Sequence, residues 1–165
     1  MKKIVECVPN ISEGNDQSVI NKIVETVEKY PGIKLLNVDP GKATNRTVIT
    51  FVGDADIIVD AAFKLISKAK ELIDMRKHIG EHPRMGAVDV CPLIPISGIS
   101  MEETVDLAHK LSERVGNELS IPVYCYEYAA KEDKRKNLAN CRAGEYEGLE
   151  NKFKDSLWKP DYGPS

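Results

Sequence analysis

The sequence has little of what exported, membrane-embedded and nucleic-acid-binding proteins need. Its four cysteines (Cys7, Cys91, Cys125 and Cys141) form no CxxC pair, which argues against a disulfide framework and favours four reduced thiols. No apolar run approaches the ~20 residues of a membrane helix. The formal net charge is -3, so the overall charge does not indicate a partner such as nucleic acid or an anionic membrane.

What is present is typical of a soluble globular domain. Hydrophobic residues make up 42% of the 165 residues and charged residues 30%, and this length is enough for one hydrophobic core. The N-terminal residues "MKKIVECVPN" pass directly into a strand-like pattern. We therefore expect no secretory signal and a cytoplasmic location.

The order of apolar patterns predicts an α+β fold. Helical spacing over residues 17–30 and 55–75, and a capping box of Ser100 and Glu103 before residues 101–119, predict three helices. Strands are predicted at residues 2–8, 33–39, 46–53, 87–96 and 121–129, and short helical pieces at 133–139 and 145–156. The order βαββαβ plus an extra αβ is typical of a ferredoxin-like sandwich, with helices on one face of a mostly antiparallel sheet.

The stretch "KHIGEHPRMGAVDVCP", residues 77–92, contains two of the three histidines. Gly80 and Pro83 disfavour a regular helix there. His78 and His82, although four residues apart, are therefore not expected to share a helical face. Because no third imidazole or thiol lies nearby, the pattern does not predict a metal site.

Two interpretations of His82 remain open at this point. It is either a loop histidine bonded to neighbouring backbone, with Glu81 and Arg84 solvated, or a proton-transferring group on a rigid turn. Glycine and proline fix the backbone, and imidazole suits proton transfer near neutral pH. These features favour the second interpretation.

Two more polar loops follow predicted strands. One offers Asp39, Lys42, Asn45 and Arg46, and the other Asn10, Ser12 and Glu13. Both are also ordinary turn sequences. The functional alternative is that Asp39 accepts a histidine ring N–H and fixes its tautomer.

Two further features favour structural roles. His109 lies near the edge of an amphipathic helix and is expected to be structural. The run "KEDKRK" at 131–136 is expected to be a solvated surface, with attraction of an acidic ligand tail as the alternative.

Five stretches together resemble a known family. They are "VECVPNISEG", "VDPGKATNRTVITFVG", "HIGEHPRMGAVDVCP", "RAGEYEGL" and "PDYGPS". They are similar to the N-terminal half of the glutamate formiminotransferase domain, which in animals is fused to a cyclodeaminase. The resemblance implies transfer of a formimino (or formyl) group from N-formiminoglutamate to tetrahydrofolate during histidine degradation, with no metal.

The resemblance also assigns residues. The family's catalytic histidine falls on His82 and its supporting aspartate on Asp39. The folate-binding stretch would begin at Gly163, Pro164 and Ser165. One imidazole can take a proton from the attacking amine and return it to the leaving nitrogen.

Substrate-binding residues are expected among the same polar loops. Arg84 or Arg46 could clamp a glutamate carboxylate bidentately, and Asn10 could offer a polar group. These assignments are our own hypotheses and are based on the chemistry of the side chains.

The family has a second, similar subdomain. We expect residues 1–155 to form one domain and residues 156–165 to begin a connector to that second subdomain. The expected protein partner is that second subdomain or, as the alternative, another copy of this chain in a homo-oligomer. Two other functions stay open: a non-catalytic folate-binding or assembly module, and a hydrolase that uses water as the acceptor.

Overall fold

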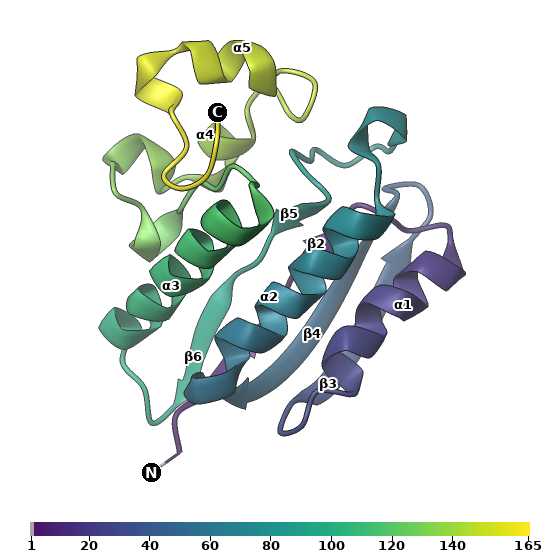
Figure 1. The fold of residues 1–165 in the computed structure, drawn as a ribbon, viewed down its shortest axis with the longest axis vertical. Helices are drawn as coiled ribbons and strands as arrows, with labels where there is room; N and C mark the ends of the chain where they lie inside the picture. The colour runs from purple at the N-terminus through teal and green to yellow at the C-terminus, as the bar shows by residue number, and fades with distance from the viewer. Residues whose placement is uncertain (1) are drawn as a thin grey trace.

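Three long helices cover one face of an antiparallel sheet in the computed structural model, which describes residues 2–165 (Figure 1). The strands are β1 (Ile4–Cys7), β2 (Asn10–Ile11), β3 (Lys34–Gly41), β4 (Arg46–Asp54), β5 (Val88–Val90) and β6 (Leu93–Ser97). The helices are α1 (Gln17–Glu28), α2 (Ala55–Leu72), α3 (Met101–Leu119), α4 (Leu138–Arg142) and α5 (Leu149–Lys154). The predicted α+β class is confirmed.

The sheet has the order β5-β2-β4-β1-β6, and β3 pairs with the other edge of β4. All of these pairings are antiparallel. Pro9 separates β1 from β2, and Pro92 separates β5 from β6, because proline has no N–H for a ladder. Their carbonyls still accept hydrogen bonds, from Ile49 N at 3.0 Å and from Val8 N at 3.2 Å respectively.

Local signals place the helix starts. The side chain of Asp16 caps α1 and that of Asp54 caps α2. The predicted capping box is present at α3, where Ser100 and Glu103 bond reciprocally. These caps satisfy N–H groups that the first helical turn leaves free.

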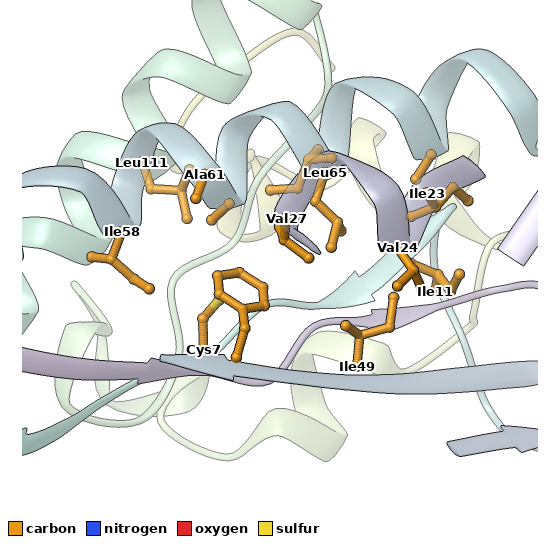
Figure 2. Close-up of a cluster of buried hydrophobic side chains, with 14 of the residues drawn as sticks. Cys7, Ile11, Ile23, Val24, Val27, Ile49, Ile58, Ala61, Leu65 and Leu111 are labelled. Carbon is orange, nitrogen blue, oxygen red and sulfur yellow. The ribbon is translucent and has the colours of Figure 1, made fainter. Parts of the chain in front are cut away.

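The core lies between the sheet and the three long helices. Thr47, Ile49 and Phe51 of β4 are fully buried on this side. Figure 2 shows Cys7 and Ile49 from the strands pointing toward Val27 and Leu65 from the helices.

The opposite side of the sheet, here called the helix-free face, carries the alternate residues of β4. They are Arg46, Val48, Thr50 and Val52, all of them half-buried. Asn10 of β2 and Asp39 of β3 are both paired with Val48. Since directly paired residues share a face, Asn10, Val48 and Asp39 form one row across the helix-free face.

The strand predicted at residues 121–129 is wrong. This stretch contributes only an isolated bridge between Val123 and Tyr162 and a 3-10 turn at Glu127–Ala129. The N–H of Cys125 donates to the Asp161 carboxylate at 2.8 Å instead of to a neighbouring strand. Alternating tyrosines therefore produced a strand-like pattern in an irregular segment.

The C-terminal segment, residues 121–165, is held by Arg135. Its guanidinium bonds to Asp161 Oδ1 at 2.6 Å, and both side chains are 4% exposed. It also donates to the carbonyls of Leu157 and Lys159. The expectation of a solvated 131–136 run is thus wrong for Arg135, and residues 156–162 pack against the fold. The helix α5 lies within the piece predicted at 145–156, whereas α4 overlaps the piece predicted at 133–139 only at residues 138–139, and a 3-10 turn occupies Asp133–Arg135.

The four cysteines are free, and the sulfur atoms of Cys7 and Cys91 lie 3.5 Å apart. Within residues 2–165, no helix is both long and apolar enough to cross a membrane.

Candidate functional site

The turn that contains His82 lies against the turn between β3 and β4. Figure 1 shows it as the teal loop between α2 and β5. Glu81 N donates to Ala43 O at 3.1 Å, and Asn45 Nδ2 donates to Ile79 O at 3.0 Å. A Cβ at Gly80 would lie 2.3 Å from Thr44 O, so the close approach of the two turns needs glycine.

The hydrogen bonds of His82 define its tautomer. Its Nδ1 lies 2.7 Å from the carbonyl oxygen of Pro83, and its Nε2 contacts the guanidinium of Arg46. A carbonyl can only accept and arginine can only donate. The ring is therefore neutral, with the proton on Nδ1 and a lone pair on Nε2. His82 is half-buried, so this lone pair is a base at the surface.

Asp39 does not contact this ring. It is exposed on β3 and lies on the helix-free face, diagonal to Arg46 across the β3–β4 pair. Within residues 2–165, no hydrogen bond joins Asp39 to His82, and the ring N–H is donated to Pro83 O. The orienting role of Asp39 stays a prediction.

Asn10 places an unused acceptor on the same face. The residue is 6% exposed, and its Nδ2 donates to Val8 O at 3.1 Å. Its Oδ1 is buried and has no partner among the described residues. Because an unpaired buried acceptor is unfavourable, this oxygen suits an N–H group of a ligand.

Arg84 is placed elsewhere than predicted. It is 7% exposed, and its Nε donates to His78 while its Nη2 donates to His78 O and Glu147. Its Nη1 donates to Glu145 and Glu147. These bonds occupy all five guanidinium N–H groups, so none remains for a substrate carboxylate.

His78 and His82 point to different partners. His78 Nε2 lies 2.8 Å from Asn45 O, and its Nδ1 accepts from Arg84. In the part of the chain that the structure describes, no group of three or more His, Cys, Asp or Glu side chains could hold a metal.

Positive charge gathers around Arg46. Burial, and then the charge of Arg142, lower the pKa of Arg46, while Asp89 raises it. Arg142 bonds to the carboxylate of Asp89, so two guanidinium groups share the field of one carboxylate. The excess positive charge favours a negatively charged ligand. Sequence reasoning missed Arg142 and Asp89, because they lie 53 residues apart and only the fold brings them together.

The predicted folate residues Gly163, Pro164 and Ser165 are exposed at the end of the chain. The backbone of Gly163 passes close to Gly116 at the end of α3 and to Ile121 O. No hydrogen bond joins these three residues to His82 within the described residues. Nearby, His109 Nδ1 lies 2.9 Å from the Tyr162 hydroxyl, which agrees with a structural role for His109.

Comparisons with known proteins agree with the resemblance. Residues 4–165 match the family described as "Formiminotransferase domain, N-terminal subdomain". The chain is 52% identical over 165 residues to formimidoyltransferase-cyclodeaminase of Dictyostelium discoideum, covering 100% of this chain and 31% of the relative. It is 48% identical over 163 residues to glutamate formimidoyltransferase of Streptococcus pyogenes serotype M1, covering 99% of this chain and 54% of the relative. The Thermoplasma acidophilum enzyme of that name is 48% identical over 164 residues, at 98% and 54% coverage. The chain thus spans about a third to a half of the length of these relatives.

Proposed function

Because the chain belongs to the formiminotransferase family, whose N-terminal subdomain it matches over residues 4–165, we propose that it is the proton-transferring half of a glutamate formimidoyltransferase. The substrates would be N-formiminoglutamate (or the formyl analogue) and tetrahydrofolate as co-substrate. The observation that best supports this proposal is the lone pair of His82 Nε2 beside Arg46, at the edge of the helix-free face.

The proposed chemistry is one proton moved twice by one ring. Tetrahydrofolate supplies an amine as nucleophile, and a C–N bond to the formimino carbon forms while the C–N bond to glutamate breaks. His82 Nε2 accepts the amine proton and then donates it to the departing glutamate nitrogen, so the ring ends neutral as it began. Pro83 O keeps the other ring proton on Nδ1 throughout.

Arg46 controls access to that lone pair. Its guanidinium contacts His82 Nε2 in the structure, so the ring cannot accept a proton until Arg46 moves. Arg46 forms no ion pair within residues 2–165, and the neighbouring charge of Arg142 raises the local positive potential. A substrate carboxylate would draw Arg46 into a bidentate pair and expose the base.

The other site residues enter as follows. Asn10 Oδ1 fits an N–H of the amidine or of the amine. Asp39, on the same face, would stabilise the positive charge of the protonated ring. Gly163, Pro164 and Ser165 would begin the folate-binding stretch. A second subdomain, from the same chain or a partner, would complete the site.

The sheet order supports the finer fold assignment that we propose. If β1 with β2 and β5 with β6 each count as one interrupted strand, the elements follow βαββαβ. The sheet then reads fourth, first, third and second strand, all antiparallel. This is a ferredoxin-like sandwich followed by α3 and the C-terminal segment.

A non-catalytic folate-binding or assembly module is the second candidate. Ile94 and Ile96 of β6 are 38% and 53% exposed, and Ile94 is paired with Glu6 on the helix-free face. Exposed isoleucines on a sheet face favour burial against a partner. This observation also fits the first candidate, in which the partner is the second subdomain.

A transfer assay separates the two candidates. Formimino transfer is measured for the chain alone and together with a second subdomain, for the wild type, His82→Ala and Lys77→Ala. Lys77 is an exposed cation that precedes the same turn and serves as the control. Loss of a general acid–base group reduces kcat by roughly 10²- to 10⁴-fold. Equal activity of the wild type and the His82 variant would rule out the proposed role of the ring.

A further inference from the structure

The buried guanidinium of Arg84 joins its own turn to a loop that is distant in sequence. It bonds to His78 in its own turn and to Glu145 and Glu147 in the loop 143–148. Two further bonds from main-chain N–H groups strengthen the junction: Tyr146 N donates to Arg84 O at 3.1 Å, and Arg84 N donates to the Glu145 carboxylate at 3.3 Å. Arg84 is thus enclosed by the loop 143–148.

The bond from Arg84 fixes the tautomer of His78. Arginine can only donate, so Nδ1 of His78, 2.8 Å from Arg84 Nε, is the acceptor. The ring proton is therefore on Nε2, which donates to Asn45 O at 2.8 Å. His78 and His82 hold opposite tautomers four residues apart.

Asn45 connects His78 to the candidate site. It adopts a left-handed conformation with φ of 49°, and its Oδ1 accepts from Gly14 N at 2.8 Å and from Asn15 Nδ2 at 3.1 Å. The carbonyl that His78 holds belongs to the peptide that joins Asn45 to Arg46. The orientation of that peptide decides where the Arg46 side chain leaves the sheet.

We propose that Arg84 and His78 are positioning residues that place Arg46 against His82, and that the loop 143–148 keeps them in place. The chain of contacts runs from Glu147 through Arg84 and His78 to the Asn45 carbonyl. This inference rests on the proposed role of His82 for its kinetic consequence, but the placement itself is a property of the chain without substrate.

Charge supports the arrangement. The bond from Arg84 lowers the pKa of Glu147 to about 2, with burial opposing the shift. The loop carboxylate is therefore ionised at neutral pH. Both ring nitrogens of His78 are paired without a glutamate, through Asn45 O and Arg84 Nε. The loop 143–148 therefore acts on His78 only through Arg84.

A spectroscopic test needs no activity. Two-bond ¹H–¹⁵N spectra of the histidine rings are recorded at about pH 8, above the usual histidine pKa of ~6.5. We expect the wild type to show a proton on Nε2 of His78 and on Nδ1 of His82. In Arg84→Met, the ¹⁵N chemical shift of His82 Nε2 should change, because Arg46 no longer donates to it, while Pro83 O keeps the ring proton on Nδ1. Unchanged His82 signals in Arg84→Met would overturn the proposal.

A second pair of variants guards against misfolding. Glutamine at position 78 carries an acceptor and a donor on one amide, so His78→Gln can keep the bonds to Arg84 and to Asn45 O. His78→Phe keeps the ring shape but neither bond. The wild-type ¹⁵N chemical shift of His82 Nε2, which reports the contact with Arg46, should persist in His78→Gln and be lost in His78→Phe.

Kinetics of the form that is active in the transfer assay complete the test. A misplacement of about 1 Å in a catalytic geometry can cost about 10²-fold, so His78→Phe should lower kcat by about 10- to 100-fold, with KM changed less. His78→Gln should stay within about threefold of the wild type on the same scale. The matched control is His109→Phe, which removes a half-buried histidine that bonds to the Tyr162 hydroxyl, outside the turn of His82.

The outcomes separate the two proposals. An inactive wild type with the expected ring spectra overturns the proposed function but supports the positioning role. Equal losses of kcat in His78→Phe and His109→Phe overturn the positioning role, because a general loss of stability would then explain both.

Discussion

Replacing Asp161 with asparagine tests what holds the C-terminal segment to the fold. Asp161 and Arg135 are each 4% exposed in their side chains and 2.6 Å apart. The second carboxylate oxygen accepts from Cys125 N at 2.8 Å. Asparagine keeps the shape but removes the negative charge, which leaves the Arg135 guanidinium buried without a counter-charge.

The expected magnitude follows from the burial of this pair. Breaking a buried ion pair by removing one partner costs about 3–5 kcal/mol. With a urea dependence of about 2 kcal/mol per molar, the unfolding midpoint of the segment should fall by about 2 M. The control is Asp133→Asn, since the Asp133 side chain is 95% exposed and forms an ion pair with the exposed side chain of Lys136. That change should cost less than about 0.5 kcal/mol.

Two spectroscopic signals separate the segment from the core. Trp158 is the sole tryptophan of the chain and packs edge-on against Tyr124, with ring centroids 5.8 Å apart. Its fluorescence reports the C-terminal segment, whereas far-UV circular dichroism reports mainly α1, α2 and α3. Within the C-terminal segment, the β-type pairing is limited to an isolated bridge between Val123 and Tyr162. We therefore expect this segment to unfold before the core, so that the midpoint measured by Trp158 fluorescence falls more than the midpoint measured by circular dichroism. Equal midpoints for Asp161→Asn and Asp133→Asn would refute the reasoning.

Three further predictions concern the turns and the buried thiols. Glu147→Gln should remove a stabilising contribution of about 1 kcal/mol or less. In the wild type this contribution is present above about pH 4.5 and is lost toward pH 2, because the pKa of Glu147 in the folded state is lowered to about 2. Measurements of the unfolding free energy against pH check this. Gly80→Ala should destabilise by about 1–3 kcal/mol through a contact of 2.3 Å, whereas Gly86→Ala, with its nearest contact at 3.7 Å, should have almost no effect on the melting temperature. Burial raises the pKa of the Cys7 thiol well above its usual value, so mass spectrometry should find native alkylation at half-buried Cys91 before Cys7.

Elements with strong local signals could be predicted from the sequence. The helix α3 begins where Ser100 and Glu103 predicted, because a capping box acts within one turn. The segment 121–129 could not, because the partner of its backbone is Asp161, which lies 36 residues from Cys125. Alternation within a short window contains no information about a carboxylate so distant.

The candidate site shows the same division. The turn around His82 is a local property of glycine and proline, and it was predicted. The pairing of Arg84 within the protein could not be predicted, because its carboxylate partners, Glu145 and Glu147, lie 61 and 63 residues away. The face of Asp39 also depends on a non-local feature: the register of β3 shifts between Leu35 and Asn37. Strict alternation from Leu35 would have placed Asp39 on the core side.

The three arginines near His82 differ in how many protein partners they have, and this difference ranks their roles. Arg84 has partners for every N–H and is fixed. Arg142 is paired with the carboxylate of Asp89, although its Nε has no partner among residues 2–165. Arg46 has no carboxylate partner in the described part of the chain and contacts only the neutral ring of His82. A guanidinium forms a stronger hydrogen bond with a carboxylate than with a neutral acceptor. In the proposed mechanism, an incoming anion would therefore move Arg46 before the other two, and that movement would uncover His82 Nε2.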